Sequence, residues 1–447
     1  MSRTWYCFSI WTSILAVCTD LAGQSPPVFR AGFAAVDITP PPGTPKQGGN
    51  AEQAASSVLD PLYARAAAFE LGAERIAIVV VDTALIQAVD VAAIRRKTTL
   101  DHGLPTDRLL VAATHNHAGP AVDDPAFFRD HAYVESMVVK AAGAVGLALA
   151  ALEPAEIGVG SAFEWNVAYN RRVRMRDGTT RTHGSLQDPN ALGFEGPIDP
   201  EVGVMAARGR DGKVLGAIVN FACHAGHHWD DGVISAGFPG AMVRQLKDRG
   251  VPFALFLQGA AGNMHHQDPR GAPEKSAEEI GKLLAGAAAR ALESAKWFRP
   301  KRIAAASRTL SLAYRQVSSE EARGAVKGAQ RFEEKGYYDR KIPGLIARSK
   351  AGPALGEVQV LRIDEVAIAS QPSESFAELG LRIKEETWPV RTFVAGYANG
   401  MLGYIPTREA FRRGGYESTF GPPSFMAPET GDQLAEAAVA LVKELSR

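Results

Sequence analysis

The sequence predicts an α/β fold in which central sheets are flanked by helices. Short segments rich in Val and Ile alternate along the chain with longer segments rich in Ala and Leu. The short segments are apolar on both faces, which is typical of strands buried between helices. With 46% hydrophobic and 22% charged residues, the chain can bury a large core. Its 447 residues are compatible with one elaborated domain or with two.

The first half of the chain contains two predicted strands and one predicted helix. The strands are RIAIVVVDT at 75–83 and RLLVAAT at 108–114, which have the length and composition of buried strands. The helix is expected over 133–152, because this Ala- and Leu-rich segment is long enough for a helix and stops just before Pro154. This order of elements favours an α/β domain.

The second half repeats this order and then becomes more charged. Strands are predicted at 214–224 and 251–259, each running into a polar loop, and a helix is predicted at 276–295. The charged stretch 318–350 is expected to form solvated surface helices. The segment EVQVLRIDEVAIASQP at 357–372 is expected to form a β-hairpin.

The charge balance argues against a polyanion as the partner of this chain. Lys and Arg number 49, Asp and Glu number 49, and no long block of one sign occurs. Electrostatic binding to nucleic acid or to an anionic membrane depends on an excess of basic charge. We therefore expect no nucleic-acid partner, and the sequence leaves the oligomeric state open.

The first 23 residues have the layout of a secretory signal peptide. Arg3 precedes a mostly apolar run from Trp5 to Cys18, and small residues follow up to Gly23. The run is too short and too interrupted for a spanning helix, which needs about 20 apolar residues. We expect cleavage near Gly23, a periplasmic or secreted protein, and no transmembrane span in the mature chain. A lipoprotein anchor is the alternative, although Val17 is bulky where a small residue is expected.

The cysteines fit a folded chain without disulfides. Cys7 and Cys18 lie in the removable segment, so Cys223 is alone in the predicted mature chain. An intramolecular disulfide is then excluded, and an exported fold must depend on packing.

Seven of the ten histidines lie in three loops that follow predicted strands. Ligands of α/β folds commonly bind where strands end. Neutral imidazole is the commonest protein ligand of zinc, and two or three imidazoles with a carboxylate leave one position open for water. The three loops therefore predict a mononuclear metal site, and the alternative is that some of these rings fill turns or surface positions. The seven are His115, His117, His224, His227, His228, His265 and His266.

Eight motifs occur in the order in which neutral, non-lysosomal ceramidases carry them. They are AGFAAVDITPPPGTP, DPLYARAAAFE, ATHNHAGP, AYNRR, NFACHAGHH, QGAAGN, QPSE and GYANGMLGYIPTREAFRRGGYE. The chain thus resembles the catalytic domain of this family over about residues 31 to 430, and we assign 31–447 to a ceramidase-like catalytic domain. The resemblance implies an α/β fold and one zinc ion used to hydrolyse the amide of N-acylsphingosine, a sphingolipid.

The resemblance also implies the metal ligands. It matches His115, His224, Glu374 and Tyr404 to the zinc ligands of the family. Without the resemblance, Glu374 would be a loop carboxylate and Tyr404 a half-buried aromatic residue, because nothing in their spacing indicates a metal.

Three further residues match groups that act on the substrate. His117 corresponds to a proton-transfer group, which would take a proton from the metal-activated water and pass it to the leaving amine. Arg171 corresponds to a substrate-contacting arginine, with the adjacent Arg172 as the alternative. Tyr416 corresponds to a phenol near the scissile bond, and both Arg171 and Tyr416 would orient the substrate or stabilise an oxyanion.

The chain departs from the family pattern in two places. Where the ceramidases carry Gly-Asp-x-Ser-Pro-Asn, this chain has the segment GAAGN at 259–263, so the serine with an assigned catalytic role is replaced by Gly262. Activation of water by zinc does not need that hydroxyl. The ceramidases also continue into an immunoglobulin-like C-terminal domain, which this sequence is expected to lack.

Two hypotheses of function follow. The first is an exported, zinc-dependent hydrolase of an N-acyl amide or an ester, acting through a metal-activated water on a small-molecule or lipid-like substrate. Loss of the serine favours a substrate other than ceramide and leaves cleavage of ceramide itself open. The second is a non-catalytic, zinc-binding exported protein that uses the ceramidase scaffold for recognition. Loss of the serine favours the second, whereas retention of every matched ligand and of His117 favours the enzyme.

Overall fold

The computed structural model describes residues 1–2, 4–5, 27–48, 53–123 and 129–446. Almost all of the expected signal peptide, with Cys7 and Cys18, lies outside these residues. Export therefore stays a prediction, and so do the proposed boundaries of the mature domain. Cys223 is a buried free thiol.

The larger sheet is mixed, and its parallel pairs lie at its two ends. The inner neighbours in this sheet run antiparallel, whereas β6–β7 and β15–β17 run parallel. Each parallel pair is connected through a helix, which is the usual crossover for parallel strands. The order is β17 (Ala254–Gln258), β15 (Val214–Phe221), β14 (Glu201–Gly209), β9 (Glu153–Phe163), β1 (Phe29–Asp37), β5 (Tyr63–Leu71), β6 (Glu74–Val81) and β7 (Leu109–Ala113), with β19 (Lys296–Phe298) paired to β9.

A second sheet of four strands packs face to face on the first. The hairpin β21–β22 turns at Asp364, which adopts a left-handed conformation with a φ of 48°, so the hairpin predicted at 357–372 is confirmed. The last pair, β22–β24, is again parallel and connected by a helix. The strands are β20 (Ile303–Leu312), β21 (Ala354–Ile363), β22 (Val366–Ser370) and β24 (Arg391–Ala395).

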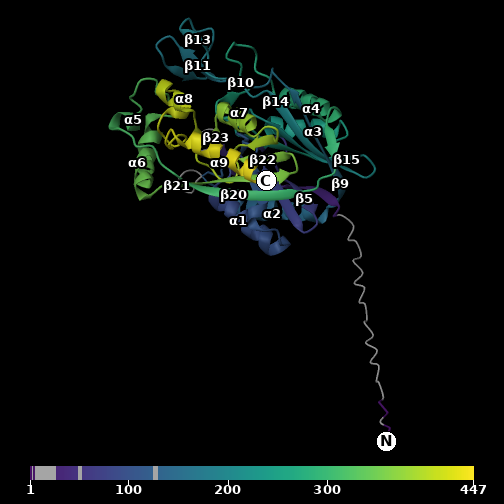
Figure 1. Cartoon of the computed structure of the whole chain (residues 1–447). Coiled ribbons are helices and arrows are strands. Elements are labelled where there is room, and N and C mark those ends of the chain that lie inside the picture. Colours follow the sequence, from purple (N-terminus) through teal and green to yellow (C-terminus); the bar gives the residue numbers. More distant parts are fainter. Residues whose placement is uncertain (3, 6–26, 49–52, 124–128, 447) are drawn as a thin grey trace.

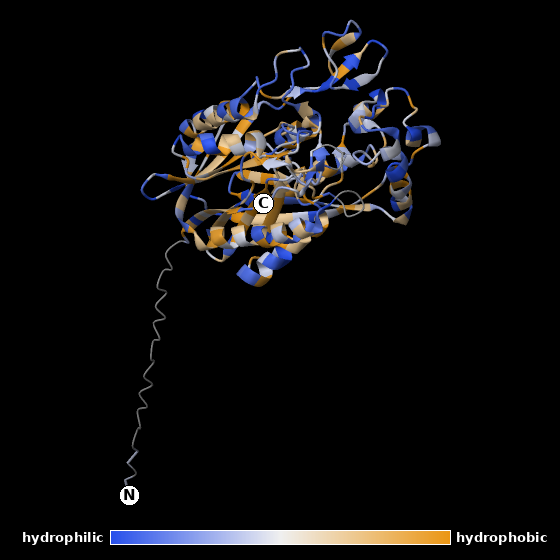
Figure 2. Ribbon diagram, turned by 180° about the vertical axis from the view of Figure 1, so that it is seen from behind, coloured by the Kyte–Doolittle hydropathy of each residue, from blue (hydrophilic) through white to orange (hydrophobic). Residues whose placement is uncertain are grey.

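Helices cover the outer faces of both sheets, as Figure 1 shows for α1 and α2 below the strands and α7 and α9 above them. The larger sheet is covered by α1 (Ala88–His102), α2 (His131–Ala150), α3 (Gly237–Lys247) and α4 (Ala277–Glu293). The smaller sheet is covered by α7 (Ala377–Glu386) and α9 (Thr430–Glu444). The buried residues of α6 (Lys335–Ala351) belong to the same hydrophobic cluster. Figure 2 shows the hydrophobic residues concentrated on the central strands.

Strand β6 shows how the core is divided between the layers. Its alternate side chains Ala77, Val79 and Val81 pack with the helices. The side chains between them face the second sheet, in the same cluster as Leu361 and Ile368. The prediction that strands are apolar on both faces is therefore confirmed. The expectation that helices cover both faces of these strands was wrong for the inner face. A sheet covers the inner face, where helices had been expected.

The remaining elements are short, and some of them, such as β23 and β25, carry residues of the site. The helical ones are α5 (Ser319–Arg323), α8 (Arg408–Arg413), η1 (Thr106–Arg108) and η2 (Tyr416–Ser418). The short strands are β2 (Pro45–Gln47), β3 (Gln53–Ala54), β4 (Ser57–Val58), β8 (Gly119–Pro120), β10 (Tyr169–Asn170), β11 (Arg172–Met175), β12 (Thr180–Thr182), β13 (Ala191–Phe194), β16 (Val233–Ile234), β18 (Met264–His265), β23 (Glu374–Ser375) and β25 (Tyr404–Ile405).

Helix α2 is the one helix in the described part of the chain that is long and apolar enough to span a membrane. It contacts β1, β5 and α1. Its buried residues include Val134, Met137, Ala141 and Val145, which recur at the spacing of one helix face. This is the environment of a core helix that packs on a sheet.

Candidate metal centre and active site

The loops that carry the predicted site begin at the carboxyl ends of the parallel strands. His115 follows β7, His224 follows β15, and Glu374 follows β22. The sheet order separates β7 from β17, yet the two strands contact each other. The segment 396–399 fills the gap, because Ala113 N donates to Tyr397 O and Gly396 N donates to Gln258 O. Curvature of the larger sheet thus brings both ends to one site.

Gln258, the last residue of β17, ties the two histidine loops together. Its amide nitrogen donates to the carbonyl oxygens of Thr114 at 3.2 Å and Cys223 at 2.8 Å. These residues immediately precede His115 and His224. Gln258 is fully buried, so these bonds are made away from water. One side chain therefore fixes the distance between the two predicted zinc ligands.

Both of these histidines are oriented by backbone carbonyls. The Nδ1 atom of His115 donates to Ala84 O at 2.8 Å, and Nδ1 of His224 donates to Ala261 O at 2.8 Å. The proton on Nδ1 leaves a lone pair on Nε2, and such a carbonyl partner is typical of metal-bound histidine. Burial lowers the pKa of both rings well below the ordinary value, so both are neutral at neutral pH.

His117 shares the same space. Its Nε2 atom lies 3.0 Å from Nε2 of His115, and its ring hydrogen-bonds to the backbone of Gly48. Three ring nitrogens, one each from His115, His117 and His224, lie within 4.8 Å of one another. Burial lowers the pKa of His117 to about 4.

Glu374 and Tyr404 enter the cluster side by side from the parallel bridge β23–β25, in which they are direct partners. The Oε2 atom of Glu374 lies 3.4 Å from Nε2 of His115 and 3.3 Å from Nε2 of His224. The phenol oxygen of Tyr404 lies 3.2 Å from Nε2 of His224. The structure therefore brings all four predicted ligands together.

The chemistry of this donor set fits a metal ion. His115 and His224 donate their Nδ1 protons to carbonyl groups. The lone pairs on their Nε2 atoms therefore point toward the carboxylate of Glu374. Buried acceptors that face one another without a hydrogen between them repel, and a cation relieves this repulsion. Two imidazoles, a carboxylate and a phenol suit zinc, and a water or substrate oxygen would complete the coordination.

Tyr397 is a member of this cluster that sequence reasoning missed. Its ring stacks on His115 with a centroid distance of 3.9 Å, and its hydroxyl donates to Oε2 of Glu374 at 3.3 Å. Tyr397 and His115 both have left-handed backbone conformations, with φ values of 53° and 59°. Such conformations cluster at functional sites. The only sequence signal was the turn-like segment GYANG, which does not identify a tyrosine as functional.

Arg171 lies in the wall of the site and is held there by Glu417. Its Nε donates to Glu417 at 2.8 Å, and Nη2 donates to Gly262 O at 2.9 Å and to the Tyr404 hydroxyl at 3.0 Å. Burial opposes ionisation of Glu417, but Arg171 and Arg172 together lower its pKa to about 2. Arg172 has a fully buried side chain, pairs with Glu195 and Glu417, and does not line the cavity. Arg171, not Arg172, therefore faces the site.

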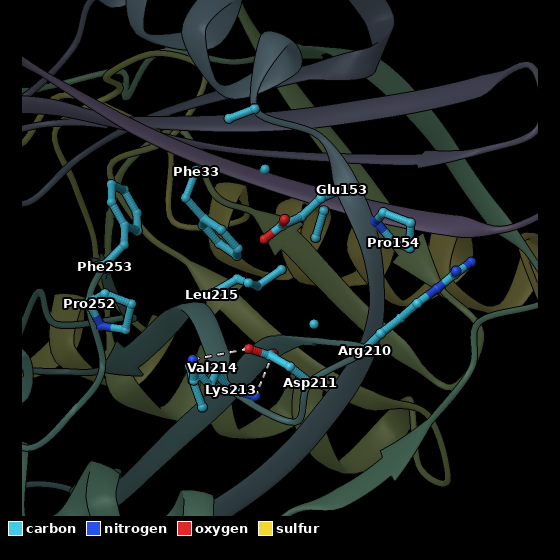
Figure 3. A pocket seen from close by; sticks show the side chains of 14 residues that line it. Phe33, Glu153, Pro154, Arg210, Asp211, Lys213, Val214, Leu215, Pro252 and Phe253 are labelled. Atoms are coloured by element: carbon cyan, nitrogen blue, oxygen red, sulfur yellow. Dashed lines mark hydrogen bonds and ion pairs between the residues drawn. The ribbon is translucent and has the colours of Figure 1, made fainter.

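The cluster lies in the wall of a cavity of about 660 Å³. Tyr416 lines this cavity, with its ring 5.7 Å from that of Tyr404 and 4.7 Å from that of Phe332. A cavity of similar volume, about 700 Å³, lies around Phe33, Leu215 and Arg210 (Figure 3). The 14 residues that line it include no histidine or cysteine. The four predicted metal ligands and the predicted substrate-contacting groups line the first of these two cavities.

Comparison with known proteins identifies solved structures with a similar fold. The sequence matches no family model and no curated protein. Among solved structures, a ceramidase complexed with C2 aligns with a TM-score of 0.75 and 20% identity, over 94% of this chain and 75% of that one. The neutral ceramidase from Pseudomonas aeruginosa aligns with a TM-score of 0.73 and 20% identity, over 95% of this chain and 75% of that one.

The chain has the fold of a neutral ceramidase. The fold implied by the sequence motifs is therefore confirmed. At 20% identity the likeness concerns the fold, and the proposed roles of single side chains depend on the geometry described above.

Within this ceramidase fold, Gly262 has no room for a side chain. A Cβ atom at this position would lie 2.3 Å from the carbonyl oxygen of Glu374 and 3.1 Å from the Phe376 ring. The backbone N–H of Gly262 also donates to Ser375 O. The glycine is thus required by the close approach of the metal-site strand β23, and a serine here would displace Glu374.

The other clustered histidines of this chain lie in different surroundings. His265 lines the cavity, with its ring 6.1 Å from that of His224. His228 is at the surface, where its Nδ1 lies 2.5 Å from Asp231. His227 and His266 stack on each other at 4.0 Å, outside the first metal cluster.

Proposed function

We propose that this chain is an exported, zinc-dependent amidohydrolase that cleaves a linear N-acyl amide. The observation that carries the proposal is the convergence of His115, His224, Glu374 and Tyr404 in the wall of one cavity, with His117 beside them. These four residues would hold the zinc ion. The likeness to ceramidases supports an amide as the bond that is cleaved.

A zinc ion in this site would polarise the scissile carbonyl and lower the pKa of water to about 7. His117 is neutral at neutral pH, because burial lowers its pKa to about 4. Its Nε2 atom faces the cluster and would accept the proton of the attacking water. The same atom would then donate this proton to the leaving amine.

Arg171 and Tyr416 would act on the carbonyl side of the substrate. The positive charge of Arg171 lies beside Tyr404 and lines the cavity, so it would stabilise negative charge that develops on the carbonyl oxygen. The phenol of Tyr416 lines the same cavity and would donate a hydrogen bond to the substrate. Glu417 would act only by positioning Arg171.

The cavity favours a lipid-like acyl chain. One part of its wall is formed by aromatic and aliphatic side chains, which suit a hydrocarbon chain. They are Leu85, Trp229, Phe332, Tyr337, Met401 and Phe425. The rest of the wall carries polar and charged side chains, among them Asp123, Glu274, Glu333 and Arg348.

We also propose that the protein is exported, as its first 23 residues suggest. The described residues contain one cysteine and no disulfide, so their fold does not depend on an oxidising compartment. Sequencing the N-terminus of the protein purified from a periplasmic extract or culture medium tests this. A mature chain that begins near residue 24 supports export, and an intact N-terminus in the cytoplasm contradicts it.

A substrate screen tests the proposed reaction. Purified wild-type protein loaded with zinc is incubated with N-acyl amides of increasing chain length and with matched esters, and free acid is measured by mass spectrometry. We expect hydrolysis of at least one N-acyl amide and no acylated residue on the protein during turnover, since Gly262 carries no hydroxyl. An acylated residue would contradict the mechanism. Inactivity toward the whole panel, with zinc bound and the fold intact, would favour the non-catalytic hypothesis.

A further inference from the structure

A second group of metal-ligating side chains lies next to the first. It consists of His227, from the loop after β15, and of His266 and Glu274, from the loop between β18 and α4. One ligand atom from each lies within 4.8 Å of the other two. The proposed zinc hydrolase mechanism uses none of these residues.

The ring of His227 is oriented as a metal ligand would be. Its Nε2 atom lies 2.9 Å from the carbonyl oxygen of Lys275 and donates to it. The lone pair is therefore on Nδ1, which is buried and makes no hydrogen bond. This pairing of a free nitrogen with a carbonyl-bound nitrogen is the one found for His115 and His224.

His266 has two buried ring nitrogens without a hydrogen bond, whereas His227 has one. The residue His266 is 3% exposed. Oε1 of Glu274 lies 3.1 Å from Nδ1 of His266, and it can pair with the ring only when that nitrogen carries a proton. A buried polar atom without a partner costs about 1–3 kcal/mol. His266 thus has a buried Nε2 without a partner, and its ring stacks on that of His227 at 4.0 Å, so one of the two rings must turn for both to bind the same ion.

We propose that His227, His266 and Glu274 bind a second divalent transition-metal ion, of which Zn²⁺ is the example tested below. Two imidazoles and one carboxylate form a three-residue zinc set that leaves a position for water. Mg²⁺ and Ca²⁺ prefer oxygen ligands, so this set selects against them. An anion is excluded because Glu274 already brings negative charge.

The ion is accessible and has a structural consequence. The side chain of Glu274 is 50% exposed and lines the catalytic cavity, so an ion can enter from solvent. His227 lies three residues after His224, and His266 follows His265, which lines the cavity. The second ion would therefore join the loop that carries the proposed ligand His224 to the loop that carries His265, which lies beside it in the same wall.

Metal stoichiometry tests this proposal on the full chain. Metal-free protein is prepared with a chelator, dialysed against a low concentration of Zn²⁺ and analysed for bound zinc. We expect two zinc ions per wild-type chain and one in Glu274→Gln and in His227→Ala. Glu274→Gln removes only a half-exposed charge, so it is expected to fold. His228→Ala is the matched control, because this neighbouring ring pairs with Asp231 at the surface, and it should keep two.

Variants of the first site separate the two proposals. His115→Ala should lose the first ion and keep the second. One zinc in wild type, lost in His115→Ala and unchanged in Glu274→Gln, overturns the second site and leaves the proposed function standing. One zinc that is lost in Glu274→Gln and His227→Ala but kept in His115→Ala upholds the second site and overturns the first.

Discussion

At the scale of single residues, the chemistry of the site depends on which nitrogen of each histidine is occupied by the backbone. The carbonyls of Ala84 and Ala261 take the Nδ1 protons of His115 and His224, so the other nitrogen of each ring faces the cluster. Sequence identified these histidines because two loops with H-x-H or clustered histidine follow apolar strands. It could not identify their partners, since a backbone carbonyl leaves no trace in the sequence.

The first prediction concerns the metal ligands. His224→Ala should bind one zinc ion fewer than wild type, because removal of one of four ligands also leaves Glu374 facing a void. Zinc is measured on the purified protein after dialysis. His228→Ala serves as the control and should bind as much as wild type. Undiminished zinc in His224→Ala would remove this residue from the coordination shell.

The second prediction separates the role of His117 from that of a ligand. His117→Ala should keep its zinc but lose about 10²–10⁴-fold in turnover of the best amide found in the screen, the usual range for a positioned acid–base group. Its Nε2 lies as near to His115 as a ligand would, so the distance alone does not distinguish the roles. Loss of zinc together with activity would make His117 a ligand.

The third prediction concerns the glycine that replaces the family serine. Gly262→Ala should destabilise the fold by about 1–3 kcal/mol, because its Cβ would overlap the carbonyl of Glu374. Gly143→Ala in α2 is the matched control, since a Cβ there meets nothing within 4 Å and alanine favours a helix. Urea unfolding of both variants provides the measurement. Equal stability of the two would show that β23 yields to a side chain.

At the scale of elements, sequence predicted the strands that end at the site better than those that do not. The four strands expected at 75–83, 108–114, 214–224 and 251–259 correspond to β6, β7, β15 and β17. Strand β5 was missed because its segment YARAAAFEL is rich in alanine, which favours helices when taken alone. Burial between α2 and the second sheet overrides this preference.

Glu374 and Tyr404 also show the limit of local pattern. They come from short strands separated by helix α7 and strand β24, and only the pairing of β23 with β25 makes them neighbours. No spacing rule predicts such a pair. The resemblance to a family supplied them, and the three-dimensional placement is consistent with it.

The fourth prediction tests the hydrogen bonds by which Gln258 joins the loops after β7 and β15. Gln258→Leu should lower the free energy of unfolding by about 1–3 kcal/mol, because the carbonyls of Thr114 and Cys223 would lose a buried donor. Zinc affinity should fall as well, since both histidine loops would lose their common anchor. Gln433→Leu, at an exposed position of α9, is the control for the substitution itself. Unchanged zinc affinity in Gln258→Leu would show that the loops hold their positions without it.

At the scale of the whole molecule, the site exists because two sheets meet. The larger sheet supplies the histidines from both of its ends, and the smaller sheet supplies Glu374 and Tyr404 from the loops after its parallel pair. The fold class and the groups of histidines were predictable from sequence, because they follow from local composition. The curvature that joins β7 to β17, and the stacking of one sheet on another, depend on long-range packing that no local segment encodes.

The dependence of hydrolysis on the metal tests the central claim most directly. The rate of release of free acid from the best N-acyl amide is measured for chelator-treated protein, before and after addition of Zn²⁺. Wild-type protein should be inactive without metal and regain its full rate with zinc, whereas His224→Ala should stay inactive at the same zinc concentration. Full activity of the metal-free wild-type protein, or recovery of His224→Ala to the wild-type rate, would contradict a zinc-dependent reaction at this site.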